Sequence, residues 1–415
     1  MQKQIAQKFI QYYYSEYKTT LLDFITQYFQ IINTQQQFSE QPQTEQPQTE
    51  QPTLQPNTQK KQDNIKQFIQ TYQNITTQFN TTPGKYIRPF LSFSAYYFLN
   101  KQLFAKHFTR INLQQDTKIL NKILNNSQKE YLAKAPTYLI IGAYLELIHN
   151  HLLIHDDFMD KSTKRRDSST SWYAYYKKYK IKHTAYSLGV LSGNTTLLSA
   201  FNLLGVSKNI STKSIQAIIT YTYKIIEKVI QGQVADILIQ KVPIQNVSIN
   251  DIQFINENKT AIYTNIFPVK VVYKLFNQTC EPACNLILKQ LGEIFQIIDD
   301  LKDLTKSGKQ QYLDIIDKKR TLIALYAYQN ADKKTKQLLE KFYNTGYRHN
   351  PKEIAKIILK FGLTDTKNHV TQLQNSINEK YKLIPSTPLK SEHYIISIQN
   401  HLITAYYNKI LKQLA

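Results

Sequence analysis

The chain has 415 residues, of which 42% are hydrophobic, and it carries a formal net charge of +22. Its length and apolar content suffice for one large domain, or two small ones, with a substantial core. Cys280 and Cys284 are its only cysteines, which excludes a disulfide framework and leaves no zinc pattern, so we expect reduced thiols and a cytoplasmic protein. The positive charge indicates only that anions are attracted, so nucleic acid, an anionic membrane and a phosphorylated substrate all remain open.

The chain is expected to be all α-helical. It contains only ten glycines, and four of its thirteen prolines lie within residues 42–56, so most of it lacks the residues that interrupt helices. Residues 1–32 predict an amphipathic N-terminal helix, because their lysines are mixed with acidic residues and no targeting pattern is present. No apolar run reaches the roughly 18 residues that a membrane-spanning helix needs, so no transmembrane segment is expected.

A low-complexity segment follows this helix. The pentapeptide Gln-Pro-Gln-Thr-Glu occurs at 41–45 and again at 46–50. Residues 33–62 contain almost nothing that can be buried, so we predict a disordered linker rich in Gln, Pro and Thr. Helical patterning resumes near residue 64 and continues to the end, which predicts one main domain at 63–415.

Two apolar helices each end in an aspartate-rich sequence. In residues 144–160 an apolar stretch ends in Asp-Asp-Phe-Met-Asp, and Asp156 and Asp160 share a helix face with His149. In residues 294–303 apolar residues recur at i, i+3, i+4 and i+7, which is typical of one buried stripe. The face opposite that stripe carries Gln296, Asp299, Asp300 and Asp303.

Either aspartate-rich sequence alone is ordinary at the solvated end of a surface helix. Two copies on apolar helices favour a shared function, because several buried like charges are costly unless a cation neutralises them. Carboxylates at this spacing suit Mg²⁺, which binds one or two carboxylates and completes its shell with water and substrate phosphate. The pattern therefore indicates a polyphosphate held by several metal ions, with two unrelated surface helices as the alternative.

Basic residues flank both aspartate-rich sequences. Only six of the 52 basic residues are arginine, namely Arg88, Arg110, Arg165, Arg166, Arg320 and Arg348. A chain that uses lysine by default is expected to keep arginine where a planar, bidentate donor matters. Arginine forks fix the position of a diphosphate as well as neutralise it. The basic residues around the two sequences are Lys85, Arg88, Arg165, Arg166, Lys259 and Lys319.

In the order and spacing of these parts, from about residue 84 to 325, the chain resembles the trans-type isoprenyl diphosphate synthases, also called polyprenyl synthetases. The matching motifs are Gly-Lys-x-x-Arg-Pro at 84–89, Glu-x-x-His at 146–149, the first aspartate motif with Arg-Arg at 156–166, Gly-Gln-x-x-Asp at 232–236, Lys-Thr-Ala at 259–261, Phe-Gln-x-x-Asp-Asp-x-x-Asp at 295–303 and Asp-x(4)-Lys-x-Thr at 314–321. The resemblance implies the isoprenoid-synthase fold, a helical bundle around a central cavity, and a homodimer.

The resemblance also implies a role for each matching residue. Three Mg²⁺ ions per active site, with Mn²⁺ as an alternative, would be held by Asp156, Asp157, Asp160, Asp299, Asp300 and Asp303. The allylic diphosphate would be gripped by the catalytic cations Lys259 and Lys319 and by Arg165, with Gln296 ordering the site. The residues implied to hold isopentenyl diphosphate are Lys85, Arg88, His149 and Arg166. Thr260 and Gln233 would line the region where the allylic cation develops.

The reaction implied is the condensation of isopentenyl diphosphate with an allylic diphosphate, with release of diphosphate and without a side-chain nucleophile. Four positions depart from the family pattern. Asn194 stands where an aspartate is common, Asp167 and Lys318 stand where glycine is usual, and Tyr86 where a basic residue is usual. None of them is a central metal ligand, so activity is expected.

Product length in the family is set on the helix before the first aspartate motif, where this chain has His151 and Leu152. A bulky residue at 151 resembles the short-chain enzymes and favours a C15–C20 product, with C20 preferred. An ideal helical wheel, however, turns Leu152 rather than His151 toward the cavity, and leucine is a smaller barrier than an aromatic ring. Medium-chain and long-chain products therefore remain alternatives.

Three other functions are weaker alternatives. A regulatory subunit of a heteromeric synthase would usually lack one aspartate motif, and both are intact here. A terpene cyclase shares the fold but has no use for an isopentenyl diphosphate site. A nucleic-acid-binding role is not expected, because the basic residues form no nucleic-acid motif and a general lysine bias explains their number.

Overall fold

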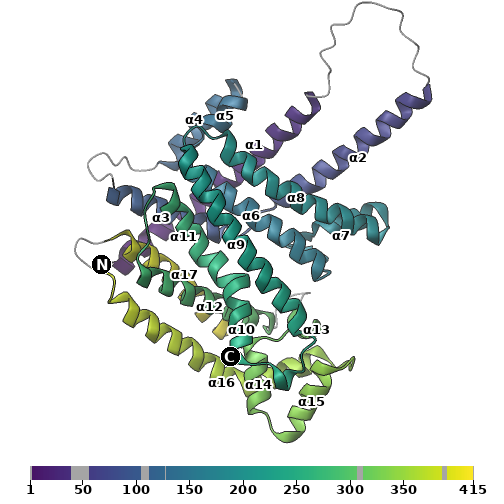
Figure 1. The fold of residues 1–415 in the computed structure, drawn as a ribbon, viewed down its shortest axis with the longest axis vertical. Helices are drawn as coiled ribbons and strands as arrows, with labels where there is room; N and C mark the ends of the chain where they lie inside the picture. Colours follow the sequence, from purple (N-terminus) through teal and green to yellow (C-terminus); the bar gives the residue numbers. More distant parts are fainter. Residues whose placement is uncertain are drawn as a thin grey trace, which may run out of the picture. The chain divides into compact units, whose positions relative to one another are not determined.

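The computed structural model describes residues 2–38, 56–103, 112–126, 128–305, 312–385 and 390–414. Almost every element is helical, which confirms the all-α fold class (Figure 1). The elements are α1 (Gln2–Phe38), α2 (Pro56–Thr81), α3 (Ile87–Leu103), α4 (Leu113–Asn126), α5 (Gln128–Lys134), α6 (Thr137–Met159), β1 (Lys164–Arg165), β2 (Ser168–Ser169), α7 (Ser171–Tyr179), α8 (Lys182–Val206), α9 (Thr212–Ile239), η1 (Ile244–Asn246), α10 (Ile249–Asn256), η2 (Glu257–Ile266), α11 (Phe267–Leu275), α12 (Pro282–Asp303), α13 (Leu313–Ile316), α14 (Leu322–Asn330), α15 (Lys333–Asn344), α16 (Pro351–Tyr381) and α17 (Ser391–Leu414).

The chain divides into two compact units. One, which we call the C-terminal unit, comprises Met1–Tyr14, Leu91–Arg110 and Thr212–Ala415; the other, the N-terminal unit, comprises Ser15–Phe90 and Ile111–Ser211. The first aspartate motif belongs to the N-terminal unit and the second to the C-terminal unit.

The N-terminal helix extends further than the sequence indicated. α1 runs to Phe38 and α2 begins at Pro56, so helix occupies both ends of the segment 33–62 for which a linker was expected. Residues 39–55, which hold the pentapeptide repeats, lie outside the described residues. The division into a helix, a linker and one domain at 63–415 stays a prediction.

α6 is the central helix of the N-terminal unit. Its residues from Tyr138 to Ile148 are buried on every side, as expected for a helix that is apolar all round, and it packs along α8. No membrane-spanning segment was expected from the sequence, but α6 is long and apolar enough to cross a membrane. However, 78% of its apolar window is buried inside the protein. That burial is typical of a core helix, so α6 is weak support for a membrane span.

A short hairpin follows α6. Strands β1 and β2 pair antiparallel, with Lys164 opposite Ser169 and Arg165 opposite Ser168. The two residues between them, Arg166 and Asp167, have φ of 51° and 60°. Positive φ at both central residues is what a type I′ turn requires, and aspartate tolerates it better than most side chains. Asp167 thus has a left-handed backbone conformation that glycine adopts easily, which explains why glycine is usual here in the family that the sequence resembles.

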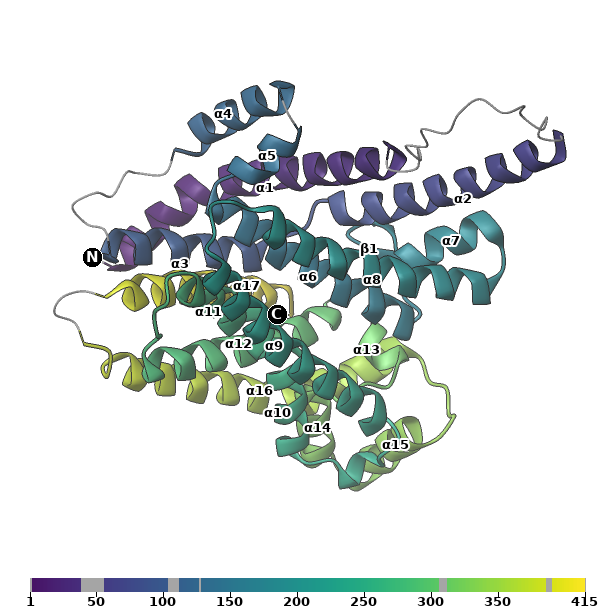
Figure 2. The same cartoon turned by 45° about the horizontal axis from the view of Figure 1, so that its top comes forward.

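In the C-terminal unit the second aspartate motif lies at the end of α12, which packs against η2, α16 and α17. Figure 2 shows α16 and α17 beside α12. η2 is a π-helix, a form that is rare and frequent at functional sites. Two glycines let neighbouring helices approach it closely. A Cβ at Gly232 would lie 2.5 Å from the backbone nitrogen of Lys259, and a Cβ at Gly292 would lie 2.5 Å from the Cα of Ala261. α9 and α12 therefore hold η2 by backbone contact on two sides.

Candidate functional site

The loop after α6 is fastened so that the hairpin folds back onto the first aspartate motif. The indole Nε1 of Trp172 donates to the backbone oxygens of Ser162 at 2.7 Å and Asp157 at 3.1 Å. The hydroxyl of Thr170 also donates to the oxygen of Ser162, at 2.7 Å. Lys161, at φ 53°, makes the turn that starts this loop. These bonds fix the path of the chain that carries the two arginines.

Arg165 pairs with the first two aspartates. Its Nε donates to Asp157 Oδ1 at 2.6 Å, and its Nη2 donates to Asp156 Oδ2 at 3.4 Å. Asp157 is fully buried, and burial raises the pKa of its carboxyl to about 7, although Arg165 opposes the shift. Asp160 lies at the C-cap of α6 and is half-buried. The structure thus brings a cation and three carboxylates together at one helix end.

Arg166 is held by a different set of groups. Its Nη2 donates to Glu146 Oε1 at 2.9 Å, and its Nη1 donates to the backbone oxygen of Thr82 at 3.0 Å. Glu146 is only 1% exposed, so the arginine neutralises a buried carboxylate. A Cβ at Gly84 would lie 2.7 Å from the guanidinium carbon of Arg166. The glycine of the Gly-Lys-x-x-Arg-Pro motif therefore leaves room for this guanidinium.

His149 lies beside the same arginine group. Arg88 Nη1 donates to His149 Nε2 at 3.1 Å, which requires a neutral imidazole with its proton on Nδ1. Burial, and then the charges of Arg88, Arg166 and Arg165, hold the pKa of His149 well below its usual value. The structure therefore gathers three of the four residues predicted for isopentenyl diphosphate. Lys85 is exposed on the adjoining turn.

The two candidates for product length have different surroundings. His151 is buried, and its Nδ1 donates to the backbone oxygen of Gly193 on α8 at 3.0 Å. Burial lowers the pKa of His151 to about 4, so the ring is neutral. His155 packs against it with ring centroids 4.6 Å apart, and a Cβ at Gly193 would collide with His155. Leu152 is half-buried. His151 thus contacts α8 through the backbone of Gly193.

In the C-terminal unit η2 supplies both residues of the Lys-Thr pair. Lys259 Nζ donates to Asp236 Oδ2 on α9 at 2.6 Å. The hydroxyl of Thr260 donates to Gln296 Oε1 at 2.6 Å, and Gln296 Nε2 donates to Asp300 Oδ1 at 2.7 Å. This chain of bonds connects η2 to the second aspartate motif and fixes the orientation of the Gln296 amide.

The second aspartate motif is less exposed than the sequence indicated. Its apolar stripe is buried and Asp299 is exposed, as the wheel predicts, but Asp300 is buried although it lies on the polar face. Asp303 accepts backbone N–H bonds from Leu313 at 3.0 Å and Asp314 at 3.1 Å. These bonds show that α13 covers part of the polar face, which a wheel of one helix cannot reveal.

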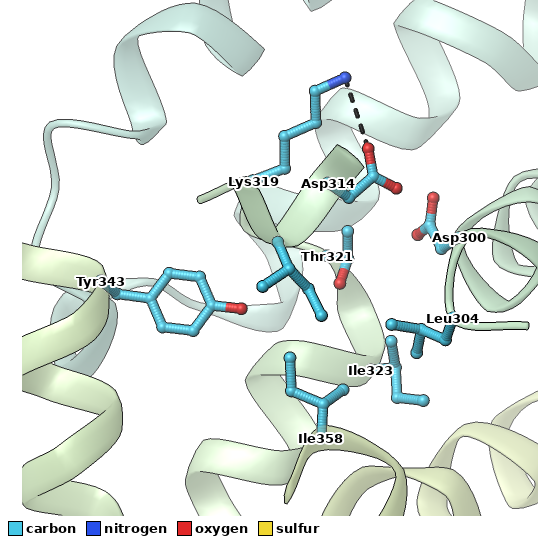
Figure 3. Close-up of a pocket in the computed structure, with 9 residues that line it drawn as sticks. Asp300, Leu304, Asp314, Lys319, Thr321, Ile323, Tyr343 and Ile358 are labelled. Carbon is cyan, nitrogen blue, oxygen red and sulfur yellow. Dashed lines mark ion pairs between the residues drawn. The ribbon is translucent and has the colours of Figure 1, made fainter. Parts of the chain in front are cut away.

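Burial and mutual repulsion act on this acidic cluster. They raise the pKa of Asp303 to about 7 and that of Asp300 well above its usual value, with Asp314 the main charged contributor in both cases. Asp314 is itself only partly relieved by Lys319, whose Nζ lies 3.5 Å from its Oδ1. Figure 3 shows the Lys319 amine directed at Asp314, beside Asp300. The cluster therefore has more negative charge than its own cation compensates.

A small cavity of about 10 Å³ lies beneath these carboxylates (Figure 3). Its polar lining comes from Asp300, Asp314, Lys319 and Thr321, and the hydroxyl of Tyr343 points into it. A polar cavity of that size accommodates about one water molecule. The cavity is too small for a substrate, so its lining residues support the acidic cluster and do not form a substrate pocket.

The residues present fit Mg²⁺ bound together with a diphosphate. Among the described residues, no three His, Cys, Asp or Glu side chains converge on a metal by themselves. Mg²⁺ needs only one or two carboxylates when water and phosphate complete its shell. The buried Asp157 Oδ2 accepts no hydrogen bond from the described part of the chain, so this oxygen needs an additional partner such as a cation or its water.

Three carboxylates that pair with predicted substrate-binding cations were not singled out from the sequence. Glu146, Asp236 and Asp314 were only letters of motifs, yet each pairs with a predicted substrate-binding cation. Glu146 lies one helical turn before His149, and this spacing could have placed its carboxylate beside the predicted substrate-binding residues. The distance in sequence between Asp236 and Lys259 left no comparable signal.

Comparison with known proteins agrees with these motifs. Residues 69–360 match the family model described as polyprenyl synthetase, which is more than half of the chain. The short chain isoprenyl diphosphate synthase of Methanocaldococcus jannaschii is 28% identical over 225 residues, covering 53% of this chain and 64% of that enzyme. The farnesyl diphosphate synthase of Buchnera aphidicola is 29% identical over 213 residues, covering 49% of this chain and 71% of that enzyme.

A solved structure shows the same fold. The geranylgeranyl pyrophosphate synthase of Corynebacterium glutamicum, complexed with isoprenyl diphosphate and magnesium, matches with a TM-score of 0.71 and 18% identity. The match covers 95% of this chain and 99% of that one. With the family model spanning most of the chain and the motifs in their expected order, the protein is a member of the polyprenyl synthetase family of prenyl-transferring enzymes.

Proposed function

We propose that the protein is a Mg²⁺-dependent trans-prenyltransferase. It condenses isopentenyl diphosphate with dimethylallyl, geranyl or farnesyl diphosphate, and its end product is an all-trans C20 diphosphate. The observation that carries the proposal is the composition of the two clusters. Each contains several carboxylates beside a smaller number of cations, an arrangement that needs the metal-bound diphosphate which the family uses.

The allylic diphosphate is gripped by Arg165, Lys259 and Lys319, whose carboxylate partners hold their amino or guanidinium groups in place. Bound Mg²⁺ supplies neutralisation of the charge that develops on the departing diphosphate. The allylic C–O bond breaks with both electrons passing to that diphosphate. Thr260 and Gln233 line the region where the allylic cation develops, and Gln296, whose Oε1 accepts a hydrogen bond from the Thr260 hydroxyl, orders the site.

Isopentenyl diphosphate is held by Arg88, Arg166 and Lys85, and the neutral His149 orders Arg88 without adding positive charge. Its double bond attacks C1 of the cation and forms the new C–C bond. The attack leaves a carbocation on the isopentenyl unit. A proton then passes from the carbon next to this cationic centre to an oxygen of the departed diphosphate, which restores a double bond. Gln233, whose buried Nε2 has no hydrogen-bond acceptor within the described residues, offers a donor to bound substrate.

Incubation of the purified protein with Mg²⁺, labelled isopentenyl diphosphate and each allylic primer in turn tests the proposal. We expect a prenyl diphosphate to form with at least one primer and to be absent when EDTA replaces Mg²⁺. Chromatography of the dephosphorylated products gives their length. Absence of product with every primer would leave a regulatory subunit as the better reading.

The C20 product is proposed from the helix before the first aspartate motif. Relatives named as farnesyl, geranylgeranyl and decaprenyl diphosphate synthases all match the chain, so the matches alone do not select a length. Replacing Leu152 or His151 by alanine removes side-chain bulk there, and we expect products longer by one or more five-carbon units. Leu198→Ala, on the exposed side of α8, is the control. Unchanged products in both variants would place the barrier elsewhere.

We also propose that the enzyme is a homodimer. α9 carries an exposed apolar stripe at helical spacing, formed by Ile219, Tyr223, Ile230, Val234 and Ile237. Contiguous exposed apolar surface of this kind is typical of a protein interface. Ile230→Lys is expected to convert dimers to monomers in sedimentation equilibrium, whereas Gln231→Lys, off the stripe, leaves them intact. A wild-type monomer at micromolar concentration would contradict this assignment.

A further inference from the structure

Arg320 is buried and has none of the diphosphate-binding roles proposed above. Arg88, Arg165 and Arg166 were assigned to diphosphates, Arg348 is exposed and Arg110 lies outside the described residues. Arg320 is 5% exposed. A buried guanidinium is costly unless its donors are used, so its contacts indicate what it does.

Those contacts are with main-chain oxygens of three segments. Nη1 donates to the oxygen of Lys318 at 2.6 Å, and Nη2 donates to the oxygens of Val242 at 2.9 Å and Tyr343 at 3.2 Å. The guanidinium carbon lies 5.1 Å from the centroid of the Tyr343 ring, a cation–π distance. Within the described residues Nε has no acceptor, and burial lowers the pKa of the guanidinium. Arg320 therefore connects backbone segments and binds no carboxylate there.

Lys318 fastens the same segment from its other end. Its Nζ donates to the backbone oxygens of Thr345 and Tyr347 and lies 5.1 Å from the centroid of the Phe342 ring. Its φ of 53° is a conformation that favours glycine, which is the family's usual residue at this position. The lysine thus adopts an unfavourable backbone conformation and places its amine against residues 342–347.

Lys319, between these two residues, is directed elsewhere. Its amine lies 3.5 Å from Asp314, and its backbone N–H donates to the oxygen of Asp314 at 2.8 Å (Figure 3). Lys318 and Arg320 consequently fix the backbone on both sides of Lys319 against the 342–347 segment. Tyr343, which holds Arg320, also lines the cavity beneath Asp300 and Asp314.

We infer that Arg320 is a positioning residue for the allylic diphosphate, acting through Lys319. It holds the backbone of Lys319 so that the lysine amine stays at the acidic cluster. Lysine at 320 cannot reproduce this arrangement, because an ammonium group lacks the planar fork that reaches three acceptors. The inference rests on the proposed function, in which Lys319 grips the allylic diphosphate.

A double-mutant cycle between Arg320→Lys and Lys319→Ala tests the inference in the full-length enzyme. We expect Arg320→Lys to raise KM for the allylic diphosphate about tenfold while KM for isopentenyl diphosphate stays within about twofold, with the folded state checked by circular dichroism. In the Lys319→Ala background the same change is expected to add almost nothing to the kinetic defect. A lowered Tm in both backgrounds is compatible with this result, because the backbone contacts are lost in both.

Effects that multiply in the cycle, or equal changes in both KM values, would overturn the role of Arg320. If Arg320→Lys does not fold, Lys318→Gly removes the other attachment without backbone strain and takes its place in the cycle, with an expected rise of about threefold in the allylic KM. No change in that variant would equally overturn the inference. A wild-type enzyme that forms no product contradicts the proposed function instead, and with it the role given to Lys319.

Discussion

Asp156→Ala is expected to lower kcat/KM about a thousandfold, because charge stabilisation by a metal is worth several kcal/mol and each 1.4 kcal/mol changes a rate tenfold. Asp156 is half-buried at the end of α6, 3.4 Å from Arg165 Nη2. Its removal leaves Arg165 paired with Asp157 at 2.6 Å, so the local fold should persist. Steady-state turnover with Mg²⁺ and the best primer is the measurement.

Glu130→Ala is a matched control for this variant. Glu130 is a carboxylate of the same unit that pairs with Lys134 on the surface, so its loss should leave turnover unchanged. Asn194→Asp should also be tolerated, because Asn194 is exposed on α8. Calorimetry with a bisphosphonate provides a second readout, since Asp156→Ala should abolish its Mg²⁺-dependent binding. Turnover near the wild-type rate in Asp156→Ala would remove the metal assignment of the first aspartate motif.

Asp299→Ala should be comparably damaging, although Asp299 contributes little to the fold. The side chain is exposed, whereas the neighbouring Asp300 is buried and bonded to Gln296. We therefore expect a loss of about a thousandfold in kcat/KM with a Tm close to that of the wild type. Glu379→Ala, on the surface of α16, is the control in the same unit. A large fall in Tm would mean that Asp299 acts on folding instead.

Combining Asp156→Ala with Asp299→Ala also tests whether both aspartate clusters act on one diphosphate. If they do, the Asp156→Ala/Asp299→Ala double variant should be little worse than either single variant, because residues that act as a unit are strongly non-additive. Fully multiplied losses would indicate two independent sites. Product formation by the single variants at raised enzyme concentration gives the sensitivity that the cycle needs.

The sequence predicted the fold class and the helices of the two aspartate motifs, because apolar spacing along a helix is a local property. The stripe of α12 is buried as expected, and Asp299 is exposed as expected. The burial of Asp300 was not foreseeable from a helical wheel, because α13, which begins ten residues after Asp303, is bonded to this face of α12. Faces of one helix can be read from sequence, whereas the chain that covers them cannot.

Residues that act through backbone groups were equally out of reach. Arg320 bonds to three main-chain oxygens, and no residue type marks a carbonyl as an acceptor in the sequence. The departures at Asp167 and Lys318 were visible as missing glycines, but only the structure shows that both have positive φ. Motif comparison thus located strained positions without revealing their conformation.

The close approach of α9 and α12 to η2 has a consequence for the proposed reaction. Where backbone packs directly on backbone, as at Gly232 and Gly292, no side-chain torsions lie in between to absorb thermal fluctuation. The amine of Lys259 and the hydroxyl of Thr260 therefore begin from a scaffold with little freedom to drift. In that reaction, dipoles already in place when charge separates would require no reorganisation, so Gly232 and Gly292 would contribute to its rate.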